Sequence, residues 1–232
     1  MRKSINKVDG HFSNYDRDML TSLASPVAMF VENAILFDEQ NRQFNSILEV
    51  LAASIDAKDP LTAGHSKKVA EYSIGIAREL GFREDDIDIL RVAALLHDYG
   101  KLGTDDRILK KTSELTKEEF DHIKQHILNT KSILNKMFFA RKYKKVPLLA
   151  SFHHERLDGS GYSEGLKDDQ IPFMSKILAV ADVFEALMAK RHYHDKLSPE
   201  EAFKILDQEA GKKLHENVVA ALKSYWGKTT PP

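Results

Sequence analysis

Cysteine is absent from this sequence of 232 residues. Its absence excludes disulfide bonds and thiolate metal sites, so a bound metal ion would need histidine, carboxylate and water as ligands. An excess of charge of one sign is also absent, because 34 basic and 35 acidic residues leave a formal net charge of -1. No net field attracts nucleic acid or an anionic membrane, and we expect neither as a partner.

Long apolar runs and hairpin signals are missing as well. Residues 1–7 lack the apolar core of a signal peptide, and no run of about 18 apolar residues stands out as a bilayer span. We therefore expect a soluble, cytoplasmic protein. No two strand-like segments flank a hairpin turn, so the predicted fold class is all-α.

The N-terminal part shows helical spacing of apolar residues from Leu23 to Ile55, after a polar segment, residues 1–18, that we expect to be frayed. The polar residues 38–41 predict a break or kink within it. Two interpretations stay open. Either two helices pack within the domain, or a long connector helix pairs with a second copy in a dimer.

The chemistry centres on Leu95-Leu96-His97-Asp98-Tyr99-Gly100-Lys101, where an apolar helix carries polar groups toward the interior. An unpaired buried charge costs several kcal/mol, so such groups are neutralised by each other or by a metal ion. A salt bridge between Asp98 and Lys101 would explain this segment alone. Other ligand-type residues at similar junctions of apolar helix and polar residue favour a metal site: His65, His126, His153, His154 and Asp182.

Caps, prolines and glycines set the remaining expected helices. Thr62 caps the helix of His65, which ends at Gly81, and Thr116 with Glu119 forms a capping box before His126. Glycines 100 and 103 are expected to begin a loop. The expected helices are 62–80, 84–98, 116–134, 147–155, 174–191, a helix from 198, and 216–226.

Five histidines and two aspartates exceed the ligands of one catalytic ion, so two ions sharing Asp98 are the simplest arrangement. Two metal ions about 3.5–4 Å apart with a bridging hydroxide are suited to attack on phosphorus. Lys101 and Arg191 would add positive charge for a phosphate. The residues thus predict a metal-dependent phosphoesterase, and they do not specify its substrate.

His97-Asp98 followed by Gly100-Lys101 resembles the signature of the HD phosphohydrolase superfamily. Segments 55–66, 153–162 and 181–187, and Arg191 with Tyr193, are similar to the HD-GYP family in particular. The resemblance covers about Phe44 to Tyr225. It implies a helical HD-GYP bundle and a bacterial phosphodiesterase that converts cyclic di-GMP to pGpG, in some members on to GMP.

The resemblance also implies roles for single residues. His65, His97 and Asp182 would hold one metal ion, His126, His153 and His154 the other, and Asp98 would bridge them, with iron or manganese as the metal. The position that binds a third ion in some relatives is Leu61 here, so we expect two ions. Contacts with substrate would come from Lys101, Asp158, Gly161, Tyr162, Arg191 and His194, and Asp98 and Lys101 would be catalytic.

Segment 31–37 resembles the closing helix of a GAF sensory domain. We therefore expect an N-terminal tail and connector at 1–43, a catalytic domain at 44–226 and a disordered C-terminus at 227–232. The implied partners are cyclic di-GMP, a second copy through the connector, and a GGDEF-type or other signalling protein.

Ser163 replaces the proline of the family motif, Asp168 stands where glycine is commoner, and His194 occupies a position that is often basic. The serine removes a fixed φ and would loosen the loop. Two alternatives remain. One is a weakly active or inactive module that binds cyclic dinucleotides or proteins, and the other is an enzyme of different specificity, either a hydrolase of cyclic GMP-AMP or a di-iron oxygenase.

Overall fold

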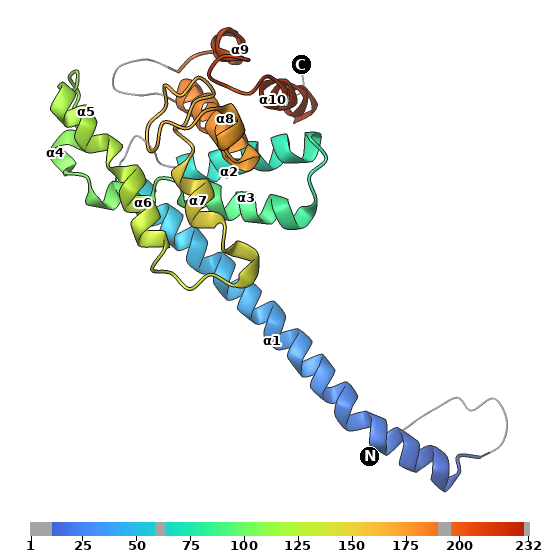
Figure 1. Ribbon diagram of the computed structural model, residues 1–232. Helices are drawn as coiled ribbons and strands as arrows, with labels where there is room; N and C mark the ends of the chain where they lie inside the picture. Colours follow the sequence, from blue (N-terminus) through green and yellow to red (C-terminus); the bar gives the residue numbers. More distant parts are fainter. Residues whose placement is uncertain (1–10, 59–63, 190–195, 230–232) are drawn as a thin grey trace. The chain divides into compact units, whose positions relative to one another are not determined.

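The computed structural model describes residues 11–58, 64–189 and 196–229. Within these ranges it contains helices and two isolated β-bridges but no strand, so the all-α prediction is confirmed (Figure 1). The helices are α1 Asn14–Lys58, α2 His65–Glu79, α3 Glu84–Leu96, η2 Tyr99–Gly103, α4 Asp106–Leu109, α5 Lys117–Lys124, α6 His126–Leu134, η3 Arg141–Tyr143, α7 Val146–Ser151, η4 Asp168–Gln170, α8 Phe173–Met188, α9 Pro199–Glu209 and α10 Glu216–Thr229.

The chain divides into two units, residues 1–47 and 48–232. This boundary lies a few residues after the expected one at 43/44. The first unit holds most of α1. That helix begins at Asn14 because the Ser13 hydroxyl accepts a hydrogen bond from the Asp16 backbone amide at 3.2 Å, so the expected fraying up to residue 18 is wrong for residues 14–18.

Helix α1 is continuous through the polar residues 38–41, so the predicted break there is wrong. These residues are exposed, and Asp38 forms an ion pair with Arg42 one turn later at 2.8 Å. Polar side chains on an exposed helix face remain hydrated, which explains why this segment does not interrupt the helix.

By length and composition alone, α1 is also apolar enough to cross a membrane, and the apolar window is fully exposed. This corrects the expectation that no segment of the chain is long and apolar enough to span a bilayer.

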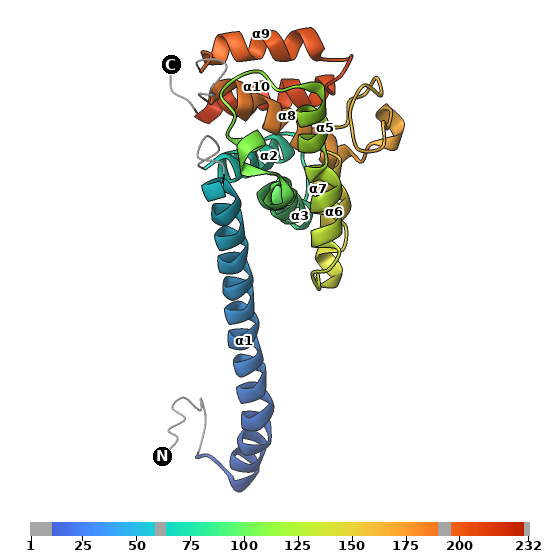
Figure 2. The ribbon, with the colours of Figure 1, turned by 90° about the vertical axis from the view of Figure 1, so that its left-hand side faces the viewer.

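The second unit is built around α2, which packs against α3, α8 and α10 (Figure 2). Phe184 on α8 is fully buried and contacts the rings of Tyr72 and Trp226 edge-on. Its ring centroid is 5.1 Å from that of Tyr72 and 5.3 Å from that of Trp226. Helix α10 continues to Thr229, so the disorder expected from residue 227 is wrong for 227–229.

Beside this layer, η2 packs on α6 and α6 on α7. Glycine at position 100 allows η2 to lie close against α6. A Cβ there would lie 1.9 Å from the His126 carbonyl oxygen, while the Gly100 amide donates to Thr130 Oγ1 at 2.8 Å. The expected loop after Gly100 is thus a 3-10 helix that lies against α6.

Several helix limits differ from expectation for local reasons. The segment after Thr116 is two helices, α5 and α6, which meet at Gln125. Helix α7 ends at Ser151, before the two histidines, and α8 ends at Met188. Thr62 lies outside the described residues, and the N-cap of α2 is Gly64.

Candidate metal centre

Three histidines share one local geometry. In each, Nδ1 donates to the backbone carbonyl three residues earlier: His97 to Ala94, His126 to Ile123 and His153 to Ala150, all at 2.7 Å. A carbonyl only accepts, so Nδ1 carries the proton and Nε2 keeps its lone pair. The fourth histidine, His65, has Nδ1 against the buried carboxylate of Glu185. A second partner of this kind is typical of metal-binding histidines.

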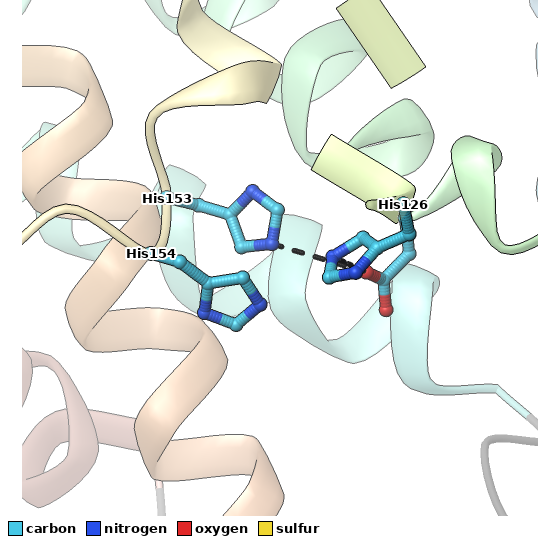
Figure 3. Close-up of side chains that lie close together, drawn as sticks. His126, His153 and His154 are labelled. Atoms are coloured by element: carbon cyan, nitrogen blue, oxygen red, sulfur yellow. Dashed lines mark ion pairs between the residues drawn. The ribbon is translucent and has the colours of Figure 1, made fainter. Parts of the chain in front are cut away.

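The lone pairs meet in the interior. Nε2 of His126 and of His153 is buried and has no hydrogen-bond partner in the described part of the chain. Figure 3 shows these rings with His154 close together, and the ring centroids of His153 and His154 are 4.1 Å apart. An unsatisfied buried polar atom costs about 1–3 kcal/mol, which a metal ion on these nitrogens would remove. The donor set therefore fits a metal ion.

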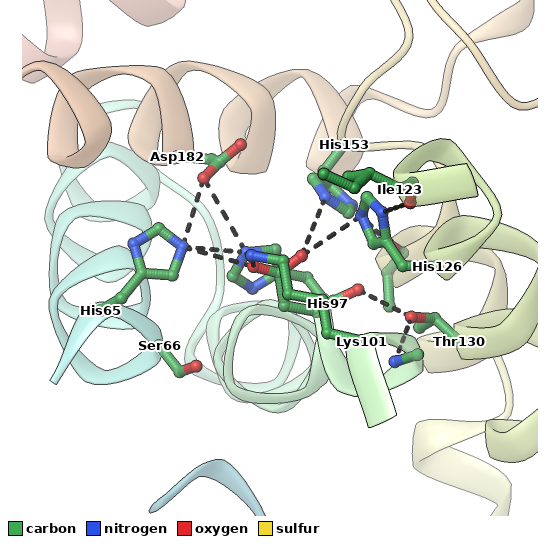
Figure 4. A network of polar contacts seen from close by, with 12 residues as sticks. His65, Ser66, His97, Lys101, Ile123, His126, Thr130, His153 and Asp182 are labelled. Carbon is green, nitrogen blue, oxygen red and sulfur yellow. Dashed lines mark hydrogen bonds and ion pairs between the residues drawn. The ribbon is translucent and has the colours of Figure 1, made fainter. Parts of the chain in front are cut away.

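Asp98 lies between two sets of nitrogens. Figure 4 shows His65 and Asp182 on one side of this region and His126 and His153 on the other. Asp98 Oδ1 is 3.3 Å from Nε2 of His126 and 3.8 Å from that of His153. Its Oδ2 is 3.7 Å from Nε2 of His65 and 3.5 Å from that of His97. One carboxylate thus offers an oxygen to each set, as a bridging ligand does.

The ligand atoms fall into two groups, each within 4.8 Å. One group is His65, His97 and Asp182, and the other is Asp98, His126, His153 and His154. Asp182 Oδ1 lies 3.4 Å from His65 Nε2 and 3.8 Å from His97 Nε2. The structure thus brings all seven predicted ligands together in two groups, as the two-ion hypothesis requires.

Burial and charge prepare these groups for a cation. Burial opposes ionisation of Asp98, but Lys101 and the nearby histidines outweigh it and hold the pKa of the carboxyl well below its usual range. Burial lowers the pKa of His153 to about 3 and that of His154 well below the usual value. At neutral pH the aspartate is charged and these two histidines are neutral, which is the state that binds metal.

His65 behaves differently. Burial would lower its pKa, but hydrogen bonds to Asp182 and Glu185 outweigh burial and raise it to about 9. The surrounding carboxylates therefore favour a positive charge on this ring, which a proton or a metal ion at Nε2 supplies.

The glycine-rich loop closes over the second group. The ring of Tyr162 stacks on His154 with centroids 4.5 Å apart, and its amide donates to the His154 carbonyl at 3.2 Å. A Cβ at Gly161 would lie 2.5 Å from that carbonyl, so only glycine fits. Glu155 is buried and accepts from the amides of residues 164–166, which fixes the far side of the loop.

The other predicted substrate residues are placed less directly. Lys101 donates to Asp98 Oδ2, beside the bridging position. Asp158 is exposed and accepts from the Ser160 amide at 2.9 Å, so the described contacts give it a role in the loop turn. Arg191, His194 and Leu61 lie outside the described residues.

Sequence analysis missed Glu185, the partner of His65, although it lies one turn after Asp182 on α8. The available signal in the sequence was that spacing, with both carboxylates inside an apolar helical pattern.

Ser163 has φ = 144°, a conformation that proline cannot adopt. We expect Ser163→Pro, which restores the family motif, to lower the free energy of unfolding by about 1–3 kcal/mol and to weaken activity. Chemical denaturation and turnover measure both effects. Ser160→Ala in the same loop is the control, and a proline variant as stable as wild type would contradict this loop conformation.

The family model "HD domain" matches residues 49–218. The 3'3'-cGAMP-specific phosphodiesterase 3 of Vibrio cholerae is 39% identical over 177 residues, 76% of this chain and 38% of that protein. A cyclic di-GMP phosphodiesterase of Thermotoga maritima is 36% identical over 217 residues, 90% of this chain and 57% of that protein. The chain thus spans between about a third and three fifths of the length of these relatives.

Two solved structures have a similar fold. A cyclic GMP-AMP specific phosphodiesterase from V. cholerae covers 80% of this chain, with 41% of its own length, at a TM-score of 0.50 and 34% identity. An HDG"Y"P protein from Bdellovibrio bacteriovorus has a TM-score of 0.59 at 19% identity over 79% of this chain and 63% of its own, which shows the fold alone. With the domain match, the chain belongs to the HD domain family, and its relatives are phosphodiesterases of the HD-GYP type.

Proposed function

We propose that the chain is a metal-dependent phosphodiesterase that hydrolyses cyclic di-GMP to pGpG, GMP or both. The observation that carries this proposal is the position of Asp98, whose two carboxylate oxygens face two separate groups of nitrogens. Two divalent ions held there would supply a hydroxide nucleophile at neutral pH and would polarise the phosphodiester.

The chain's own residues prepare this reaction. The Nδ1 contacts of the histidines fix the rings with Nε2 inward, so the ligands need no rearrangement. Lys101 is half-buried beside Asp98, where its ammonium group would neutralise a phosphate oxygen as charge develops. Tyr162, Gly161 and Asp158 would border the substrate, and Arg191 and His194 would complete its phosphate contacts.

Iron or manganese is our proposal for the two ions. Every donor atom of the cluster is nitrogen or oxygen. Imidazole with carboxylate suits these metals, and the absence of cysteine removes the ligands that favour softer ions.

The substrate is tested by comparing kcat/KM for cyclic di-GMP, 3'3'-cyclic GMP-AMP and linear pGpG, with the metal-loaded protein under anaerobic conditions. We expect cyclic di-GMP to be hydrolysed best. The named cyclic GMP-AMP specificity of the V. cholerae relative makes that dinucleotide the second candidate. Turnover of cyclic GMP-AMP alone would reassign the substrate, and turnover of none would favour a binding module.

A second copy of the chain is the proposed partner of α1. Apolar residues occur at alternating three- and four-residue steps, the spacing of a coiled-coil seam. Within the first unit, one set of positions is Leu20, Val27, Ala34 and Asn41, and the other is Leu23, Phe30, Phe37 and Phe44. In the first unit this seam meets water, and Phe30 and Phe37 are 76% and 66% exposed. A parallel two-stranded coil would cover it.

Asn41 is the polar position of this seam, and such an asparagine fixes register and dimeric state at a cost in stability. We expect Asn41→Val to strengthen the dimer about 100-fold, since two valine side chains, one from each copy, are buried and each stabilises by about 1.5 kcal/mol. Sedimentation equilibrium measures the dissociation constant. Gln43→Val, off the seam, is the control and should leave it unchanged, whereas a wild-type monomer at every concentration would remove the coiled coil.

We further propose a cytoplasmic location, with the apolar residues of α1 covered by protein instead of lipid. The seam continues past the apolar window into the polar residues 38–41, which suits a coiled coil better than a bilayer span. We also propose that residues 1–43 are a remnant of a GAF-like sensory domain, and that a GGDEF-type or other signalling protein is a further partner.

A further inference from the structure

We propose that Asp56 and Lys58, in the last turn of α1, are positioning residues that hold the two halves of the metal centre in register. This inference rests on the proposed two-metal site. It adds a structural connection between α1 and that site, made by two charged side chains that are not themselves ligands.

The first connection runs from Asp56 to the start of α2. Asp56 is 7% exposed, and its Oδ2 accepts from the Gly64 amide at 3.0 Å while its Oδ1 accepts from the Ser66 hydroxyl at 2.8 Å. These two donors flank His65, the first residue of α2.

The start of α2 depends on this contact. Its N-cap, Gly64, has φ = 78° and no side chain to accept from the first turn. Asp56 places a carboxylate from another helix beside this N-terminus, where negative charge is favourable, and it accepts from the amide of the N-cap residue and from the Ser66 hydroxyl. Asp56 therefore fixes the backbone on both sides of His65, while Glu185 fixes the imidazole ring through Nδ1.

The second connection runs from Lys58 to η2 and the residue after it. Lys58 Nζ donates to the carbonyl oxygens of Leu102 and Thr104 at 2.7 and 2.9 Å, and it lies 3.5 Å from Asp106 Oδ1. An ammonium group has three donors, and three acceptors surround it here. These carbonyls lie just after Asp98 and Lys101, so Lys58 fixes the segment that carries both.

The two connections act on different ligand-bearing elements. Asp56 holds the element of His65, and Lys58 holds the element of Asp98, whose Oδ2 faces His65 Nε2 at 3.7 Å. Metal–ligand distances tolerate only about ±0.2 Å. Because both residues belong to one helical turn, that turn fixes the spacing of the two ligand elements, and removing either contact releases one element from the other.

The turn itself is anchored in the second unit, where Leu48, Ala52 and Ile55 are buried. Asp56 and Lys58, which follow Ile55 by one and three residues, then contact the elements that carry the metal ligands. The end of α1 is therefore the place where a change in that helix acts on the metal centre without an intermediate element.

The test compares Asp56→Ala, Asp56→Asn and Lys58→Met with wild type. Manganese affinity is measured by titrating metal into apo-protein, and apo-protein melting temperature and kcat at saturating metal are measured alongside. We expect metal affinity to fall about 10- to 100-fold in the alanine and methionine variants, the usual effect of removing outer-shell support. Asp56→Asn keeps an acceptor oxygen and should recover part of the loss.

Two controls separate positioning from general stability. Ser54→Ala removes a hydroxyl on the same helix that, among the residues the structure describes, bonds to the Leu51 carbonyl of α1, so metal affinity should be unchanged. Leu206→Ala opens the core at α9, which carries none of the seven ligands, and should lower the melting temperature without this loss of affinity. If Asp56→Ala fails to fold, Asp56→Asn and Lys58→Met give the result.

Wild-type metal affinity in Asp56→Asn and Lys58→Met, or a loss in Leu206→Ala as large as theirs, would overturn the inference. This failure differs from that of the proposed function, in which wild type binds two ions but leaves cyclic di-GMP intact.

Discussion

Replacing Asp98 by alanine is expected to lower kcat by about 10³-fold or more and to reduce bound metal below two ions per chain. Asp98 is the one carboxylate in the described ranges whose oxygens face both groups of ligands. Two-metal assistance supplies several kcal/mol of transition-state stabilisation, and each 1.36 kcal/mol is about tenfold in rate. Steady-state turnover with parallel metal analysis measures both quantities.

Asp158→Ala is the matched control. That aspartate lies in the loop, is exposed and bonds to Ser160, so its loss should leave metal content unchanged and affect KM more than kcat. An Asp98→Ala protein that keeps both ions and wild-type turnover would show that the two groups of nitrogens act independently of the carboxylate between them.

Gly100→Ala is expected to lower the free energy of unfolding by about 3 kcal/mol, because overpacking a close contact costs about 1–3 kcal/mol and occasionally more. The new Cβ would lie 1.9 Å from the His126 carbonyl and 2.4 Å from the Thr130 amide, both backbone atoms that cannot rotate away. Helix α6 must therefore move away from η2. Urea denaturation measures the change.

The same displacement separates His126 from Asp98, which now lie 3.3 Å apart between Nε2 and Oδ1. We expect one ion to bind more weakly in Gly100→Ala. Gly227→Ala in α10 is the control, since nothing lies within 4 Å of its added Cβ and alanine favours a helix by about 1 kcal/mol. Equal stability of the two variants would contradict the close packing of η2 on α6.

The seven candidate ligands were predictable because each interrupts an apolar helical pattern with a group that is costly to bury alone. The same pattern could not predict the contacts that the last turn of α1 makes with the metal-binding elements. Asp56 and Lys58 act across 8 and 44 residues of sequence separation, on Gly64 and Leu102, where the partners are a backbone amide and a backbone carbonyl without a sequence signal. Such contacts become visible only when the fold is known.

Two other differences have local causes. Residues 38–41 predict a break because a core helix would exclude them, yet α1 is exposed there and polar residues are tolerated. Serine at position 163 predicts a loosened loop, because the family motif has proline there. Its φ of 144° instead shows a loop that proline does not fit, held by Glu155 on one side and by the Tyr162 contact with His154 on the other.

We propose that two ions, bridged through Asp98, make this protein a cyclic dinucleotide phosphodiesterase. The most direct measurement titrates Mn(II), or Fe(II) without oxygen, into apo-protein while hydrolysis of cyclic di-GMP is followed at each metal-to-protein ratio. We predict little turnover up to one ion per chain and full turnover as the second binds. Full turnover at one ion per chain, or none with two bound, would contradict this account.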